Sequence, residues 1–73
     1  MRQREMRFHV LTDDYSPVTK NVTQAYAENC ARHALKRMPA GSDVLICYTK
    51  GEFATDKPLY LHARYTRLAH FVT

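Results

Sequence analysis

The sequence predicts a single α+β domain in which one helix packs on a three-stranded, mainly antiparallel sheet. Three observations support this class. The 73-residue chain is long enough for only one thin hydrophobic core. One stretch with helical periodicity lies between stretches in which polar and apolar residues alternate. A lone helix and three strands form a core when the helix covers one sheet face, here in the order β-α-β-β.

Residues 5–12 form the first predicted strand, because Met6, Phe8 and Val10 alternate with polar side chains. Turn-forming residues follow, and Ser16 before Pro17 offers a cap and a first residue for the helix. A later helix start is also open. A capping pair of Asn21 and Gln24 would leave residues 17–20 outside the helix.

The helix is predicted up to residue 38, because small and apolar residues recur from residue 23 at spacings of three and four. Its core-facing set is Thr23, Tyr26, Ala27, Cys30, Ala31, Ala34, Leu35 and Met38. The opposite side is charged, with acid early and base late, as the helix dipole favours. Pro39 and Gly41 end the helix.

Two more strands follow the helix. Residues 43–50 are rich in β-branched and apolar side chains, which predicts a strand covered on both faces. After a charged loop at 50–58, the last strand places Leu59, Leu61, Ala63 and Tyr65 on one side and Tyr60, His62, Arg64 and Thr66 on the other. A right-handed crossover would join the first two strands, and the last strand would insert between them, antiparallel to both. One sheet face would remain open.

The open face is the predicted binding surface, because basic and aromatic side chains alternate on it. It would display Arg7 and His9 from the first strand, Tyr60, His62 and Arg64 from the last, and Arg2, Arg4 and Arg67 near its edges. His9 and His62 would be neighbours across strands. Three interpretations remain open: a solvated face, a single-stranded nucleic-acid interface, and a surface for an acidic protein. Leu11, Val22 and Leu45 fall off the predicted core faces and favour a protein partner.

Other chemistry has little support in the sequence. The formal net charge of +4 makes anionic partners plausible. We expect no enzymatic activity and no cofactor, because no nucleophile, base and orienting group form a recognisable set. We expect no metal site, because no histidine or cysteine pair has ligand spacing. Cys30 and Cys47 are expected to be reduced thiols.

The chain is expected to be a monomer in the cytoplasm. Its longest apolar run, residues 44–48, is far shorter than the roughly 20 residues of a membrane-spanning helix. Residues 1–10 are basic and lack the apolar stretch of a secretion signal. Residues 1–73 then form one domain, with residues 1–4 as a mobile basic arm.

The turn Met38-Pro39-Ala40-Gly41-Ser42-Asp43-Val44 resembles that of small phage-encoded inhibitors and regulators of bacterial host RNA polymerase. The resemblance implies a non-enzymatic phage protein, in the host cytoplasm, that binds the polymerase and inhibits transcription initiation or alters termination. Arginines on the last strand matter for docking in that family, and Arg64 and Arg67 occupy a comparable place. The basic arm and the longer 50–58 loop depart from the family, so the polymerase subunit and the affected stage stay open.

Overall fold

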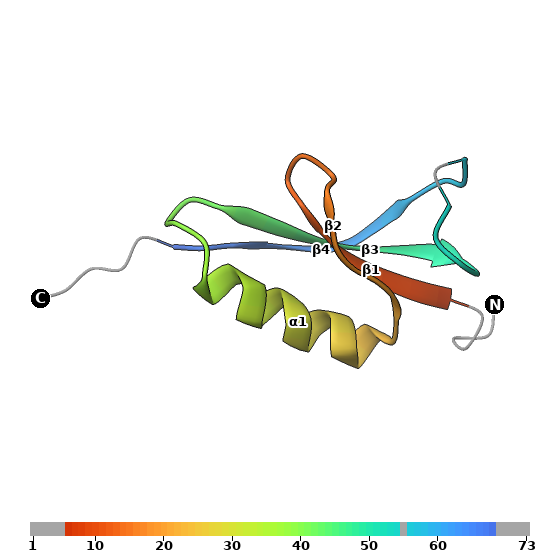
Figure 1. Ribbon diagram of the computed structural model, residues 1–73, viewed down its shortest axis with the longest axis horizontal. Coiled ribbons are helices and arrows are strands. Elements are labelled where there is room, and N and C mark those ends of the chain that lie inside the picture. The colour runs from red at the N-terminus through yellow and green to blue at the C-terminus, as the bar shows by residue number, and fades with distance from the viewer. Residues whose placement is uncertain (1–5, 55, 69–73) are drawn as a thin grey trace, which may run out of the picture.

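The computed structural model describes residues 6–54 and 56–68, which form one helix and one four-stranded antiparallel sheet. The elements, in chain order, are β1 (Met6–Thr12), β2 (Pro17–Val22), α1 (Gln24–Lys36), β3 (Asp43–Lys50) and β4 (Tyr60–Thr66). The strands lie side by side in the order β2-β1-β3-β4. The helix covers one side of the sheet, called here the helix face (Figure 1). The opposite side is called the far face.

The α+β class and the single helix are confirmed, but the prediction of three strands is wrong. The additional strand is β2, which pairs antiparallel with β1. The turn between them is closed by the Thr12 N–H, which donates to the Ser16 carbonyl at 2.9 Å, and by side-chain hydrogen bonds of Asp14. Ser16 and Pro17 therefore lead into a strand and not into the helix.

The predicted strand order is also wrong, and β2 is the reason. The hairpin reverses the chain before the helix begins, so the crossover through α1 brings β3 back antiparallel to β1. β1 is paired over its full length, from Met6 with Lys50 to Thr12 with Val44. The last strand, β4, consequently pairs with the other edge of β3 and does not insert between β1 and β3.

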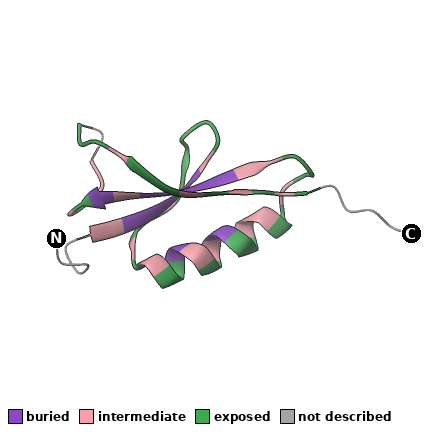
Figure 2. Ribbon diagram, turned by 180° about the vertical axis from the view of Figure 1, so that it is seen from behind, coloured by how far each residue is buried: buried purple, intermediate pink, exposed green. Residues whose placement is uncertain are grey.

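The helix begins at Gln24, so residues 17–20 lie outside it as the later of the two predicted starts requires. Its cap is Thr23, whose hydroxyl accepts a hydrogen bond from the Tyr26 N–H at 3.2 Å. Ala27 and Ala31 are completely buried, whereas Tyr26 is 60% exposed and lies off the buried stripe. Figure 2 shows the buried segments of α1 turned toward the sheet.

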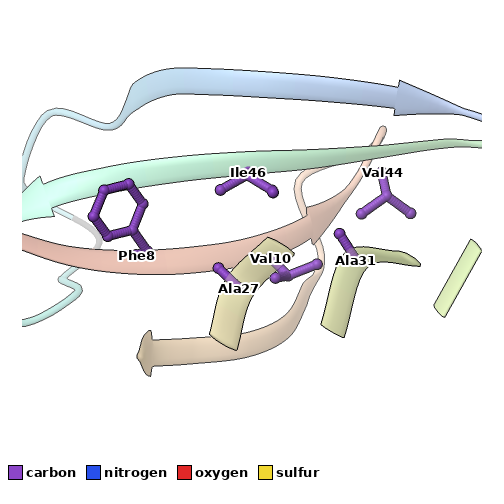
Figure 3. Close-up of a cluster of buried hydrophobic side chains, with 6 residues drawn as sticks. All are labelled: Phe8, Val10, Ala27, Ala31, Val44 and Ile46. Carbon is purple, nitrogen blue, oxygen red and sulfur yellow. The ribbon is translucent and has the colours of Figure 1, made fainter. Parts of the chain in front are cut away.

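The main core lies between α1 and the central strands (Figure 3). Phe8 and Val10 of β1 and Val44 and Ile46 of β3 pack there, each at most 2% exposed. The facing helix residues are alanines, so the helix backbone lies close to the sheet. Burial of a side chain of this size contributes about 1.5–3 kcal/mol, which makes this layer the main source of stability.

The far face is not open at its centre, contrary to the sequence prediction. Leu11, Leu45 and Cys47 form a second buried cluster there, and Leu59 packs against it. The β1–β2 turn and the connection from β3 to β4 both project from this side of the sheet (Figure 1). The expected exposure of Leu11 and Leu45 is therefore wrong, and Val22 packs against the main core on the helix face.

Candidate binding surface

A β-bulge in β4 decides which way its side chains face. Ala63 lies opposite Ile46 and Leu61 lies opposite Cys47, so His62 is an extra residue between two adjacent partners. One inserted residue reverses the alternation of a strand from that point onward. The predicted division of β4 into two uniform sides is therefore wrong.

Tyr60 and His62 consequently lie on the helix face. The Tyr60 ring stacks on Tyr48 with centroids 5.4 Å apart, and the His62 ring meets Phe8 edge-on, also at 5.4 Å. His62 also lies near the start of the helix, with its Nε2 3.8 Å from a carboxylate oxygen of Glu28. The two residues predicted to extend the open sheet face thus lie on the opposite side of the sheet.

His9 is completely buried on the far face, so its expected display to a partner is wrong. Its Nδ1 accepts the backbone N–H of Asn21 at 3.0 Å, and its Nε2 lies 2.8 Å from the Thr49 hydroxyl oxygen. The Phe53 ring covers the imidazole edge-on with centroids 5.0 Å apart. Burial, and then the nearby Lys20 ammonium, lower the pKa of His9 below its ordinary value. His9 and His62 are not neighbours.

The arginines predicted as contact residues lie in three places. Arg64 is exposed, and its guanidinium is 3.5 Å from a carboxylate oxygen of Asp43. Arg67 donates from Nη1 to the carbonyls of Leu35 and Lys36, the last two residues of α1. Arg7 is half-buried and lines a separate groove of about 680 Å³ beside the start of the helix. Arg2 and Arg4 lie outside the described residues, as does the predicted arm at 1–4.

Two overlapping hollows of about 440 and 500 Å³ follow the line where the second half of α1 meets the end of β4. Together they form what we call the helix–β4 groove. It is lined by Arg32, Leu35, Lys36, Arg64, Tyr65, Thr66, Arg67 and Leu68. Leu68 is 79% exposed and stands at its rim. The groove therefore combines apolar contact surface with cationic side chains.

The charge of the groove is one-sided. Four of the lining residues, Arg32, Lys36, Arg64 and Arg67, are cationic, and none of the lining residues is acidic. Asp43, which pairs with Arg64, lies outside the lining set. Arg32 and Lys36 belong to the charged side of the helix, opposite its predicted core-facing set. Because they are four residues apart, the sequence could have predicted that they are neighbours on the helix surface.

The turn of residues 38–42 attaches the end of β4 to this region. Gly41 has φ of +90°, a left-handed conformation that glycine adopts without steric cost. Its N–H donates to the Arg67 carbonyl at 2.7 Å, and the Arg67 N–H donates to the Ser42 carbonyl at 2.8 Å. The Pro39-Ala40-Gly41 turn thus places Arg67 beside the end of the helix.

A second candidate surface lies at the other end of the sheet and includes the predicted contact residue Tyr60. Phe8, Tyr48 and Tyr60 form an aromatic row across β1, β3 and β4 on the helix face. Tyr60, at the edge of the row, is 42% exposed. A hollow of about 200 Å³ beside it is lined by Lys50, Lys57, Pro58 and Tyr60. This arrangement offers an aromatic ring next to positive charge.

The cysteines do not pair, in agreement with the expectation of thiols. Cys30 is half-buried beside the Thr19 hydroxyl at 3.0 Å, while Cys47 is buried on the far face, where burial raises the pKa of its thiol. Across residues 6–54 and 56–68 there is no group of three or more histidine, cysteine or acidic side chains that could hold a metal ion. The one helix in this part of the chain, α1, is not long and apolar enough to cross a membrane.

No protein-family model, curated protein or solved structure matches this chain. Its two candidate surfaces, the helix–β4 groove and the aromatic row, are therefore interpreted from their own geometry and charge.

Proposed function

We propose that this chain is a non-enzymatic, phage-type regulator that docks through the helix–β4 groove on an acidic surface of bacterial RNA polymerase. The observation that carries the docking part is the groove itself, which has four cationic side chains, no acidic lining residue and an exposed leucine at its rim. The choice of polymerase is supported by the resemblance of the turn at 38–44 and by the place of Arg64 and Arg67 in the groove.

The groove has the features that protein interfaces use for affinity and for selection. Leu35 and Leu68 provide apolar area that becomes buried on contact, while the surrounding cations steer an anionic partner and set its orientation. Arginine is favoured in such positions, because its planar guanidinium pairs with a carboxylate through two parallel hydrogen bonds. The regulatory effect would then follow from occupation of the polymerase surface, which inhibits initiation or alters termination.

The test is co-elution of the purified chain with RNA polymerase core on size exclusion after nuclease treatment. The informative variant is Arg32→Glu with Arg64→Glu, which leaves Arg67 and its bonds to the helix end intact. The matched control is Lys50→Glu with Lys57→Glu, which makes the same change in net charge at the other end of the sheet. We expect the first variant to bind at least about tenfold more weakly and the control to bind as the original chain does.

Equal weakening by both variants would show that only net charge matters and would contradict docking at the groove. Failure of the original chain to bind the polymerase would contradict the proposed function altogether. Circular dichroism of both variants checks that the fold is retained, so that a loss of binding reflects the surface.

A second candidate function is single-stranded nucleic-acid binding, and the aromatic row is the observation that favours it. Tyr60 is exposed enough to stack with a base, and Lys50 and Lys57 lie close enough to contact a phosphate. This function predicts that Tyr60→Ala abolishes oligonucleotide binding while Tyr26→Ala, which removes another exposed tyrosine, does not. A titration in which neither variant differs from the original chain would exclude this surface.

A further inference from the structure

The two edges of the sheet differ in how well they are protected. At one edge, β2 begins with Pro17, pairs with β1 through two register shifts, and carries Asn21 at φ of +60°. Prolines and bulges of this kind are the features by which natural sheets discourage further strand pairing. The β2 edge is therefore poorly suited to accept another strand.

The other edge is β4, and it lacks those features over its second half. Residues 63–66 pair regularly with β3, from Ile46 opposite Ala63 to Asp43 opposite Thr66. Among the residues that the structure describes, no strand lies on the outer side of β4. A regular strand at a sheet edge presents backbone N–H and C=O groups that can pair with an extended segment.

The regular part of β4 is also the part that lines the helix–β4 groove. A segment paired with this edge would lie between Arg32 and Lys36, which belong to the helix, and Arg64, which belongs to β4. Side chains of a strand alternate between its two faces, so acidic residues at adjacent positions would reach the helix cations on one face and Arg64 on the other. The backbone edge and the charge of the groove thus favour the same kind of ligand.

We propose that an extended acidic segment of the partner protein pairs with the free edge of β4 as a fifth strand. This inference rests on the proposed function and specifies which kind of polymerase element the groove takes. A second copy of this chain is disfavoured as the occupant, because pairing of two β4 edges would bring the cations of two grooves together. The partner segment instead neutralises them.

The test is hydrogen exchange measured by mass spectrometry on the full chain, alone and in its nuclease-treated complex with RNA polymerase core. We expect amide exchange in residues 60–66 to slow at least about tenfold on binding, because the outward-facing N–H groups of the regular part, residues 63–66, enter new hydrogen bonds. Exchange in residues 17–22, at the protected edge, should not change. The Arg32→Glu, Arg64→Glu variant should show no slowing in residues 60–66.

The other outcomes are distinct. A complex that protects only residues 24–36 would overturn strand addition while leaving the proposed function in place. Absence of any complex would overturn both. Slowed exchange in residues 60–66 that grows with the concentration of the chain alone, together with a dimer in sedimentation, would assign the edge to a second copy. A complex that dissociates on nuclease treatment would assign the cations to nucleic acid, and it would also overturn strand addition.

Discussion

The buried His9 should make the stability of this protein depend on pH below neutrality. Because Nδ1 accepts the Asn21 N–H, it carries no proton, so the single proton of the neutral ring is on Nε2 and is donated to Thr49. The Thr49 hydroxyl then donates to the Gly51 carbonyl at 2.7 Å. A second proton on Nδ1 would face the Asn21 N–H, and protonation therefore removes a hydrogen bond in a fully buried site.

The sign follows from the lowered pKa of His9, which results first from burial and then from Lys20. At a pH between the folded and unfolded pKa values, the unfolded chain binds more protons at this site than the folded one. The free energy of unfolding should therefore be constant with pH above about 6.5 and fall as the pH drops below it. A single site limits the slope to about 1.4 kcal/mol per pH unit.

The His9→Leu variant should lose this slope, since nothing titrates at the site. At pH 7.5 it should also be less stable by about 1–3 kcal/mol, because the imidazole's hydrogen bonds to the Asn21 N–H and to the completely buried Thr49 are lost. Urea unfolding followed by far-UV circular dichroism at pH 7.5, 6.5 and 5.5 measures both effects. His33→Gln, which changes an exposed histidine, is the control and should keep the original slope. An identical slope in His9→Leu and the original chain would refute this reasoning.

Three further substitutions test the packing of the helix and the turn that follows it. Ala31→Leu should destabilise the fold by about 1–3 kcal/mol in urea unfolding, because Ala31 is completely buried against the sheet; an unchanged midpoint would mean that the helix is not in close contact there. Thr23→Ala should lower the free energy of unfolding by about 1 kcal/mol through loss of the helix cap. Thr19→Ala, which removes a threonine hydroxyl from β2, is the comparison variant, and an equal loss in both would contradict the capping role. Gly41→Ala should cost about 1–2 kcal/mol through its backbone conformation alone, because an added Cβ would meet no atom within 4 Å; no loss would contradict the left-handed turn.

The helix, the central strands and the main core could be predicted because their signals are local and long. Thirteen residues of helix and the alternation in β1 each repeat a pattern several times. The strand β2 was missed although Val18, Thr19 and Val22 are β-branched. Its six residues follow a Ser-Pro pair, and that pair also signals a helix start. A short edge strand cannot be distinguished from a helix lead-in by such local preferences.

The facing of β4 and the burial of His9 depend on contacts that the local pattern does not contain. The bulge adds one extra residue to β4 opposite Ile46 and Cys47 of β3. The residue types in β4 give no signal that predicts it. His9 occupies one of the polar positions of an alternating strand, so the periodicity alone predicts that its side chain is exposed. Its burial requires Asn21 from β2, Thr49 from β3 and Phe53 from the following loop, which come together only in the folded chain.

These differences also change the kind of partner that the cationic residues fit. A flat, open face carrying His9, Tyr60 and Arg64 together would suit a series of stacked bases, as in sheet-based nucleic-acid binders. The hairpin places β2 at one sheet edge and leaves β4 at the other, so Arg64, which lies opposite Leu45 on the far face, is at a sheet edge that lines the groove and away from the buried His9. A cationic groove along a regular strand edge is complementary to an extended acidic chain, in backbone hydrogen bonds as well as in charge. The strand β2, which the sequence did not predict, is therefore the reason that the cationic residues fit a protein partner better than a series of bases.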